Sequence, residues 1–359
     1  MVLACDYHLR YDARFSRGLA NQGAEVTLLT RDHDGEFGGE PGAARRFVSA
    51  AIGDRVELLT VQSRVRSPRG WAQVPALRRK LRAGTPIVHL QESIGNDPRL
   101  VIAAGTRHRR FALTVHDPVR HPGDSDSRWA FVTNRALVKS AGLIFTHGDA
   151  LRDELVEIAA PKAPIVVVPH GIFIADQAPL PAAPSILFFG RISEYKGLDV
   201  LLDAMAEVWA ALPEAALTVA GAGEIAPHPA LGDSRVTLRQ GHLPDDEVPG
   251  LFEAATVVAL PYLQASQSGV GSLAKAHSRA LVVSDVGGLP ELVADGSGRV
   301  VAAGDSETLA ETLVPILRDP ELAAEMGVAG AASARRESSW DVVAERTLAA
   351  YREYLTPRL

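Results

Sequence analysis

The stretch "ILFFGRISEYKGLDVLLDA", residues 186–204, joins a short apolar run to a helical pattern. The run stops at Gly190, and Arg191 and Lys196 stand just before apolar residues at helical spacing. A strand that turns tightly into a helix is the repeating unit of doubly wound α/β sheets. Two cations beside a helix N-terminus, where backbone N–H groups point outward, predict a site for an anion such as a diphosphate. The alternative is a surface Arg and Lys that flank an ordinary loop.

Short β-branched runs alternate with helical patterns on both sides of this stretch. The expected strands are 2–4, 25–30, 87–90, 111–115, 143–146 and 165–168, then 185–189, 216–220, 236–239, 256–259 and 281–284. Helices are expected to begin near residues 197, 245, 305 and 321. Because a helix returns the chain between successive strands, the strands are predicted to pair in parallel.

The domain organisation follows from a break in this alternation. The segment "GIFIADQAPLPAAPS", residues 171–185, is rich in proline and small residues and predicts a linker. We expect an N-terminal domain over 1–170, a second domain over 171–337 and a closing amphipathic helix in 338–359 that docks back, with the N-terminal domain as its candidate partner. The predicted fold class is α/β, with two doubly wound Rossmann-like domains facing a central cleft and ligands at the carboxyl ends of the strands.

Composition limits the class of protein. The chain has 359 residues, of which 47% are hydrophobic, which suits about two domains. A formal net charge of −6 argues against a nucleic-acid binder, and a single cysteine excludes an internal disulfide framework. Arg and Lys are enriched between Arg45 and Arg82, which favours a solvated face over its alternative, a peripheral contact with a membrane.

The expected location follows from two absences in the sequence. No apolar stretch approaches the roughly 20 residues that a membrane-spanning helix needs. The first residues show no basic leader followed by an apolar segment, so no signal peptide is predicted. We therefore expect a cytoplasmic protein.

Further motifs occur in a recognisable order along the chain. They are "LTVHD" (113–117), "VVPHGI" (167–172), "LTVAGAGE" (217–224), "RQGHLPDDEVPGLFEAATVVALPY" (239–262), "ASQSGV" (265–270) and "VVSDVGGLPELV" (282–293). Together with 186–204 they resemble the family 4 glycosyltransferases, a retaining, nucleotide-sugar-dependent group with the GT-B fold. The resemblance covers most of the chain, is strongest from Val166 to Leu317 and is weak before Ile87.

The resemblance implies a donor site in the second domain. Arg191 and Lys196 match the segment that binds the donor diphosphate. Gly221, in the loop after a strand, lies near the nucleotide, and Leu243 occupies the position that contacts the base. For Leu243 the alternative is an ordinary strand-to-helix turn. A dinucleotide fingerprint in "VAGAGE" is a weak interpretation, because the third glycine is missing.

The loop "PYLQASQSGVG", residues 261–271, is rich in donors of hydrogen bonds. Its candidate donor-binding residues are Gln264, Ser266, Ser268, Gly269 and Val270. Many family members carry two glutamates here, seven residues apart, whereas this chain has Gln264 near the first place and no acid near the second. We interpret the difference as a variant donor pocket, and the alternative for the whole stretch is a flexible loop.

The first domain offers less familiar candidates. His116 follows an expected strand, and by resemblance it would contact the donor sugar or the reacting centre, where an imidazole can donate a hydrogen bond. The alternative is a histidine that ties down the strand end. Relatives often have consecutive glycines in the first loop, where this chain has His8 and Arg10 as candidates for the donor phosphate or the acceptor pocket.

The predicted function is retaining transfer of a hexosyl-type sugar from a UDP or GDP sugar to a hydroxyl of a small-molecule, glycan or lipid-linked acceptor. His116, Arg191 and Lys196 are the predicted catalytic residues. No metal and no cofactor beyond the donor substrate are expected, because protein cations can balance the charge of the leaving group. The alternatives are a non-catalytic sugar-nucleotide binding protein and a nicotinamide-dependent oxidoreductase.

Overall fold

The computed structural model of the chain describes residues 1–5, 8–31, 34, 37, 39, 41–61, 68–82, 87–91, 98–104, 110–116, 135–244, 246–265 and 267–355. The chain divides into two compact units. The first unit contains Met1–Gly171 together with Trp340–Leu359, and the second contains Ile172–Ser339.

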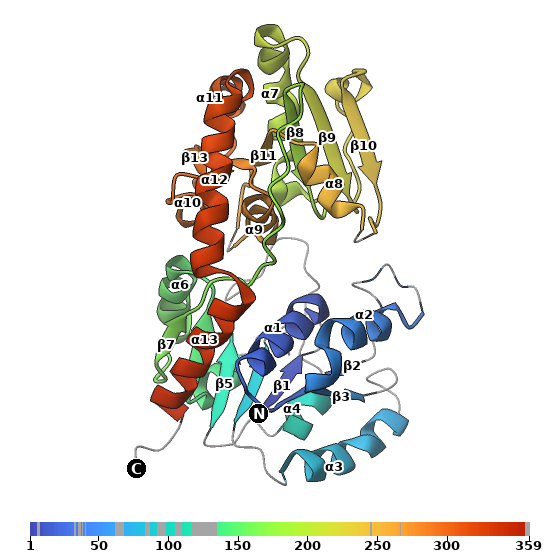
Figure 1. Cartoon of the computed structure of the whole chain (residues 1–359), viewed down its shortest axis with the longest axis vertical. Coiled ribbons are helices and arrows are strands. Elements are labelled where there is room, and N and C mark those ends of the chain that lie inside the picture. The colour runs from blue at the N-terminus through green and yellow to red at the C-terminus, as the bar shows by residue number, and fades with distance from the viewer. Residues whose placement is uncertain are drawn as a thin grey trace. The chain divides into compact units, whose positions relative to one another are not determined.

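The first unit is built on a seven-stranded parallel sheet (Figure 1). Its strands are β1 (Val2–Cys5), β2 (Val26–Arg31), β3 (Val56–Val61), β4 (Val88–Gln91), β5 (Phe111–Thr114), β6 (Leu143–Thr146) and β7 (Ile165–Val167). The strand order is β3-β2-β1-β4-β5-β6-β7. The order reverses between β1 and β4, so their carboxyl ends form the topological switch point, where doubly wound folds bind ligands.

Several helices accompany the described strands of this sheet up to β7, including helical residues 135–140. The others are α1 (Leu9–Asn21), α2 (Ala43–Ile52), α3 (Pro68–Arg82), α4 (Pro98–Ala104) and α6 (Asp149–Ala159). Helix α1 is strongly amphipathic and buries Leu9, Phe15 and Leu19 against the sheet. Its first residues therefore lie at the carboxyl edge, next to the end of β1.

The second unit contains a six-stranded parallel sheet in the order β10-β9-β8-β11-β12-β13. The strands are β8 (Ser185–Phe189), β9 (Ala216–Gly221), β10 (Val236–Gln240), β11 (Val257–Leu260), β12 (Ala280–Ser284) and β13 (Gly298–Val301). The helices are α7 (Leu198–Ala211), α8 (Val248–Glu253), α9 (Gly269–Ala276), α10 (Leu289–Leu292), α11 (Ser306–Arg318) and α12 (Pro320–Glu337). Here the switch point lies between β8 and β11.

The central strands show why short apolar runs predict the strands of this fold. Every residue of β5, β6, β11 and β12 is buried, because helices cover both faces of a parallel sheet. The expected strands are all present, with ends that differ by one residue at most. Two edge strands, β3 and β13, are not predicted, because one side of an edge strand is exposed and polar residues such as Glu57 and Arg299 interrupt the apolar run.

The C-terminal segment belongs to the first unit. Helix α13 (Trp340–Ala350) continues into a π-helical turn, Tyr351–Leu355, and lies along α1 (Figure 1). Trp340 occupies a position beside Gly171, where an added Cβ would lie 2.4 Å from the indole ring. The Tyr351 hydroxyl lies 2.5 Å from Nδ1 of His89, so the last turn is held to the sheet by packing and by a buried hydrogen bond.

The proline-rich segment that predicts a linker is held against the second unit. Arg279 is only 1% exposed, and its guanidinium donates to the carbonyl oxygens of Ala178 (3.1 Å) and Pro179 (3.2 Å). The backbone N–H of Ala175 also donates to the carbonyl of Ala276. The proline-rich segment forms no regular structure that would pair its carbonyl oxygens. The buried guanidinium of Arg279 supplies the hydrogen bonds for two of them.

Candidate functional site

The loop after β8 places Lys196 immediately before α7. Gly190 has a φ of +106° and turns the chain at the end of the strand, and residues Glu194–Lys196 form one 3₁₀ turn. Gly197 then adopts a left-handed conformation, and an added Cβ there would lie 2.0 Å from the carbonyl oxygen of Pro261. Only glycine fits this approach, so the sequence "KG" fixes the lysine against the loop that follows β11.

Lys196 is a buried cation whose partners are neutral hydroxyl and aromatic groups. It is 8% exposed, and its Nζ donates to the Tyr262 hydroxyl at 2.8 Å and lies 4.6 Å from the centre of the Tyr262 ring. The Tyr262 hydroxyl in turn lies 3.3 Å from Oγ of Ser268. Within the described parts of the chain, no carboxylate forms an ion pair with Lys196.

Burial shifts the pKa values of Lys196 and Tyr262. Desolvation lowers the pKa of Lys196; the Tyr195 hydroxyl opposes that shift and Arg191 adds to it. Desolvation also raises the pKa of Tyr262 to about 12, so its hydroxyl is neutral at physiological pH. A desolvated ammonium without a counter-ion is costly, and an anion that binds beside it removes that cost.

Lys196 and Ser268 lie at the switch point of the second sheet. Lys196 follows β8, whereas Tyr262 and Ser268 follow β11, the neighbouring strand on the other side of the reversal. The Ser268 hydroxyl caps α9 by accepting a hydrogen bond from the N–H of Gly271. Next to this helix start, an added Cβ on Gly269 would have open space around it.

Val270 and Gly221 complete the same edge of the sheet. An ideal Cβ on Gly190 would lie 3.4 Å from Nζ of Lys196 and 3.2 Å from Cγ2 of Val270. Gly221, with a φ of +148°, approaches Gly190 so closely that a Cβ would lie 1.8 Å from the Gly190 carbonyl oxygen. The structure thus brings together four predicted residues: Lys196, Ser268, Val270 and Gly221.

The structure describes three of the other predicted residues of this unit. Arg191 is exposed, and its Nη2 donates to the Tyr195 hydroxyl at 3.4 Å. Gln264 is exposed and bonds through its backbone N–H to the Tyr195 carbonyl. Leu243 is half-buried against the core around Phe252. Ser266 lies outside the described residues.

In the first unit, His116 belongs to a chain of hydrogen bonds between strand ends. Its Nδ1 lies 3.1 Å from Nε2 of His147, and its Nε2 lies 3.0 Å from Oε1 of Gln91. Nδ1 of His147 lies 2.9 Å from the carbonyl oxygen of Val168. Gln91, His116 and His147 follow or end β4, β5 and β6, which are neighbours in the sheet.

Aromatic rings surround these hydrogen-bonded residues. His8 and His116 have ring centres 4.6 Å apart, so the structure brings these two predicted residues together. His147 and His170 lie 5.2 Å apart, and the Tyr11 ring lies against both, at 5.6 Å and 4.6 Å.

This environment keeps the histidines neutral. Desolvation holds the pKa of His116 well below its usual value, and the neighbouring imidazoles lower it further. Desolvation and His147 lower the pKa of His170 to about 3. Burial lowers the pKa of His89 to about 3 as well.

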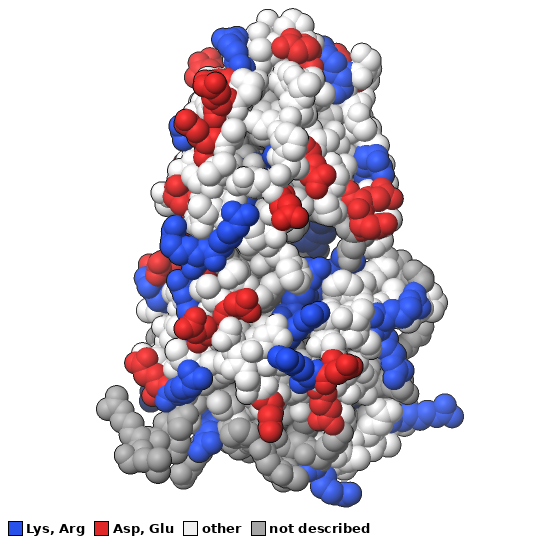
Figure 2. Space-filling model, viewed as in Figure 1, with Lys and Arg blue, Asp and Glu red and all other residues white. Residues whose placement is uncertain are grey.

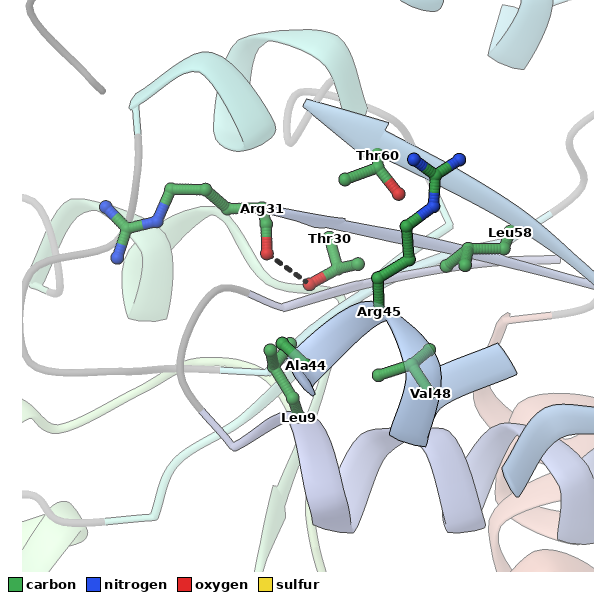
Figure 3. A pocket seen from close by; sticks show the side chains of 8 residues that line it. All are labelled: Leu9, Thr30, Arg31, Ala44, Arg45, Val48, Leu58 and Thr60. Atoms are coloured by element: carbon green, nitrogen blue, oxygen red, sulfur yellow. Dashed lines mark hydrogen bonds between the residues drawn. The ribbon is translucent and has the colours of Figure 1, made fainter. Parts of the chain in front are cut away.

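Arg10 points elsewhere. Its guanidinium lies 4.6 Å from the ring centre of Phe37 and 5.6 Å from that of Phe47. A small pocket with an empty volume of about 220 Å³ lies nearby, at the ends of β2 and β3 (Figure 3). It is lined by Leu9, Thr30, Arg31, Ala44, Arg45, Val48, Leu58 and Thr60.

This pocket is not arranged as a cradle for one anion. In Figure 3 the side chains of Arg31 and Arg45 extend away from each other, and the apolar side chains of Leu9, Ala44 and Val48 lie at one side. The Thr30 hydroxyl donates to the carbonyl of Arg31 at 3.4 Å. The pocket is therefore largely apolar, with one guanidinium on either side.

The two described helices next to this pocket are basic. Figure 2 shows Lys and Arg side chains gathered over α1 and α2. Helix α1 carries Arg10, Arg14 and Arg17, and its single acid, Asp12, is fully buried. Helix α2 carries Arg45 and Arg46 and no acid. This face is positive although the chain as a whole is negative.

The described residues contain neither a candidate metal site nor a candidate membrane-spanning helix. No group of three or more His, Cys, Asp or Glu side chains in the described part could hold a metal ion. No helix among the described residues has both the length and the apolar character to cross a membrane.

Three residues of these sites are missed by sequence reasoning. Tyr262, His147 and Gln91 each end or follow a predicted strand, and the same rule that singles out His116 would have found His147. Gln91 and Tyr262 lack such a signal, because amide and phenol side chains at strand ends are common and acquire meaning only from their neighbours.

The fold and the two strand-edge sites define a two-unit, doubly wound α/β protein with a buried cation at one switch point. The family model for glycosyltransferase family 4 matches residues 10–175, and the model for glycosyl transferases group 1 matches 183–319. A D-inositol 3-phosphate glycosyltransferase from Frankia alni is 30% identical over 305 residues, which are 77% of this chain and 70% of that one. The chain therefore belongs to the family 4 glycosyltransferases.

Two further proteins show the extent of the likeness. The D-inositol 3-phosphate glycosyltransferase from Segniliparus rotundus is 30% identical over 299 residues, 77% of this chain. The match spans only 63% of that protein's own length. The crystal structure of Anabaena HepE in complex with UDP-glucose matches with a TM-score of 0.73 and 16% identity over 98% of this chain and 100% of that one, which shows the GT-B fold.

Proposed function

We propose that the chain transfers a sugar from a nucleotide diphosphate sugar to an acceptor hydroxyl, with retention of the anomeric configuration. The observation that carries the proposal is Lys196, a buried ammonium at a switch point that has hydroxyl partners and, among the described residues, no carboxylate. A diphosphate supplies the missing charge. Arg191 adds a second cation from the same loop, and its planar guanidinium can bind two phosphate oxygens at once.

The surrounding groups support a donor nucleotide in this unit. Ser268 offers a hydroxyl at the start of α9, whose N-terminal N–H groups favour an anion. The close approach of Gly221 to Gly190 requires that neither position carries a side chain, which lets a bound nucleotide come close to the backbone at the ends of β8 and β9. The UDP-glucose complex of the Anabaena relative supports a nucleotide sugar as the donor class.

The proposed reaction needs no covalent intermediate on the protein. The bond between the anomeric carbon and the phosphate oxygen breaks, and the acceptor oxygen forms its bond to that carbon on the same face. The acceptor proton passes to the leaving phosphate. We propose that Lys196 and Arg191 stabilise the charge that develops on the diphosphate, so that transfer proceeds without a metal ion.

We assign the acceptor to the first unit. His116 stands near the switch point of its sheet, and the basic helices α1 and α2 favour an acceptor that carries negative charge. The names of the Frankia and Segniliparus relatives, D-inositol 3-phosphate glycosyltransferases, agree with such a class. A peripheral contact of these helices with an anionic membrane is tested by sedimentation with phosphatidylglycerol vesicles at low and high salt.

The decisive experiment replaces Lys196 with methionine, which keeps the length of the side chain and removes its charge. We expect turnover of UDP-glucose or GDP-mannose to fall by about 100- to 1,000-fold, because one preformed charge contact to the transition state is lost. The matched control is Lys162→Met at an exposed position. Unchanged turnover in the Lys196 variant would refute the assignment.

Donor binding is measured independently of turnover. UDP or GDP at 100 times its dissociation constant should stabilise the native protein by about 2.7 kcal/mol, and the Lys196→Met variant should lose most of this effect. Strong nucleotide binding without hydrolysis or transfer across a broad acceptor panel would favour the alternative, a non-catalytic sugar-nucleotide binding protein.

A further inference from the structure

Near the switch point of the first sheet, His116 lies among side chains that the family pattern does not explain. His8 follows β1 and Gln91 ends β4, and these strands flank the reversal in strand order. His116 follows β5 and His147 follows β6, one and two strands further along. The hydrogen bonds among Gln91, His116 and His147 therefore run across the carboxyl ends of three adjacent strands.

The contact between His147 and Val168 sets the direction of these hydrogen bonds. A carbonyl oxygen can only accept, so Nδ1 of His147 must donate its proton to Val168 across the 2.9 Å contact. A neutral imidazole carries one N–H, and Nε2 of His147 is then a lone pair. Because that lone pair lies 3.1 Å from Nδ1 of His116, the proton of this second contact belongs to His116.

The tautomer of His116 in turn determines which atom of the Gln91 amide it can bind. With its proton on Nδ1, neutral His116 has a lone pair on Nε2, which requires a donor from the amide 3.0 Å away. The amide oxygen cannot donate, whereas the amide nitrogen can. Nε2 of Gln91 is buried and has no hydrogen-bond partner among the described residues. The structure turns Oε1 of Gln91 towards Nε2 of His116, and exchanging the amide oxygen and nitrogen would place a donor at that lone pair and give the amide nitrogen a partner.

Neutrality of the imidazoles is the condition for this argument. His147 is 8% exposed and lies among the rings of His116, His170 and Tyr11. His116 is held neutral by burial and by His8, His147, His170 and His89, which lower its pKa. The opposite case, a doubly protonated His147, would leave the hydrogen bond to Val168 unchanged and would reverse the direction of the other two.

We propose that His147 is a positioning residue that fixes His116 as its Nδ1–H tautomer and leaves the Nε2 lone pair of His116 to accept a hydrogen bond. The sequence alone suggests that His116 donates a hydrogen bond, and this geometry assigns it the opposite role. A substrate hydroxyl that displaces the Gln91 amide would meet an acceptor at His116. This last step rests on the proposed function, whereas the tautomer does not.

The tautomer is measured directly in the full chain labelled with ¹⁵N-histidine. Two-bond ¹H–¹⁵N correlation spectra distinguish a protonated Nδ1 from a protonated Nε2, and His116→Phe and His147→Phe assign the signals. In the wild type we expect both His116 and His147 to carry the proton on Nδ1. An Nε2–H signal for His116, or a doubly protonated His147 at pH 7.5, would overturn the proposal.

Two substitutions test whether His147 is the cause. In His147→Phe the acceptor is lost, and His116 should switch to the Nε2–H form. In His147→Gln an amide oxygen can accept in its place, so the Nδ1–H form should persist. The matched control is His170→Phe, which alters the same ring cluster outside the hydrogen-bond chain and should leave His116 unchanged. If His147→Phe does not fold, the wild-type and His147→Gln spectra still decide.

Kinetic measurements on the His147 variants distinguish a failure of this inference from a failure of the proposed function. His147→Phe should lower kcat by about 10- to 100-fold through misplacement of His116, with UDP affinity unchanged and with recovery in His147→Gln. A switched tautomer with wild-type kcat would refute the role in catalysis. If the wild type binds UDP but turns over no donor, the proposed function fails, and the spectra still test the tautomer.

Discussion

The two switch points of this molecule are built in opposite ways. In the second unit, the residues around the buried ammonium come from two short stretches, 190–197 and 261–270, and the first of them is visible in the sequence as a motif. In the first unit, the imidazole cluster draws on the ends of β1, β4, β5 and β6 and on the segment after β7. The position of a single charged residue can be specified by nearby sequence, because glycines fix the conformation of its loop. A series of hydrogen bonds between neutral side chains depends on several strands that must lie in register.

The largest effect that tests this contrast is expected from the C-terminal helix. Trp340→Ala removes a buried indole that lies 5.0 Å from the Tyr11 ring, which itself packs on His170. We expect the first unit to lose about 3 to 5 kcal/mol of unfolding free energy. Urea denaturation measures the loss, and UDP binding by the second unit should persist. If UDP binding is lost equally, the two sites are not independent.

The second unit should be most sensitive at a glycine. Gly221→Ala would place a Cβ 1.8 Å from the Gly190 carbonyl at a φ of +148°, so the two loops must separate. We expect a loss of about 2 to 4 kcal/mol together with weaker UDP binding. Gly250→Ala is the matched control, because that position has open space and no positive φ. Equal effects of the two substitutions would contradict the close-approach argument.

The histidine cluster predicts acid sensitivity of the first unit. His89 and His170 have folded pKa values of about 3, below the unfolded value of about 6.5, so the unfolded chain binds more protons between these limits. Stability is therefore complete above pH 6.5 and is lost as the pH falls towards 3. Each such histidine contributes a slope of up to about 1.4 kcal/mol per pH unit.

The measurement compares urea midpoints from pH 7.5 to 5.0. His89→Gln should lower stability at pH 7.5 but flatten the slope by about one proton. His242→Gln, at an exposed position, serves as the control. A slope that does not change in His89→Gln would mean that this histidine is not the source of the acid sensitivity.

The smallest expected effect concerns the partner of Lys196. Tyr262→Phe removes the hydroxyl that accepts from Nζ at 2.8 Å, and we expect the second unit to lose about 1 to 3 kcal/mol. Saturating UDP should restore part of this loss, because a phosphate replaces the missing partner. The control is Tyr354→Phe on an exposed tyrosine, which should change stability by less than about 0.5 kcal/mol.

The sequence predicts the buried strands and the edge strands β7 and β10, but it misses the edge strands β3 and β13. Runs such as "LIFT" at 143–146 and "VVAL" at 257–260 are apolar throughout because both of their faces are covered. β3 and β13 lie at sheet edges and carry Glu57 and Arg299, which hide them from the same rule. The alternation of strands and helices is nevertheless sufficient to predict two doubly wound sheets.

For the sites, the sequence singles out residues that lie within one stretch, and their roles stay predictions. Lys196 and Ser268 are identified from their loops, and the structure places both next to Tyr262. The roles of Arg191 and of the loop around Gln264 in binding a donor stay predictions. Gln91 is missed because it gains its role only through a partner more than 20 residues away, whereas the strand-end rule that singles out His116 would also have found His147.

By itself, the sequence determined the parallel α/β class, the family and the position of a cation beside a helix start, because local spacing and composition encode these features. Only the tertiary structure decided that Lys196 is buried with hydroxyl partners and that His116 is held between an amide and a second imidazole. The physical reason is that burial and hydrogen-bond direction are properties of neighbours. Those neighbours are brought together by strand order, which no single stretch of the chain contains.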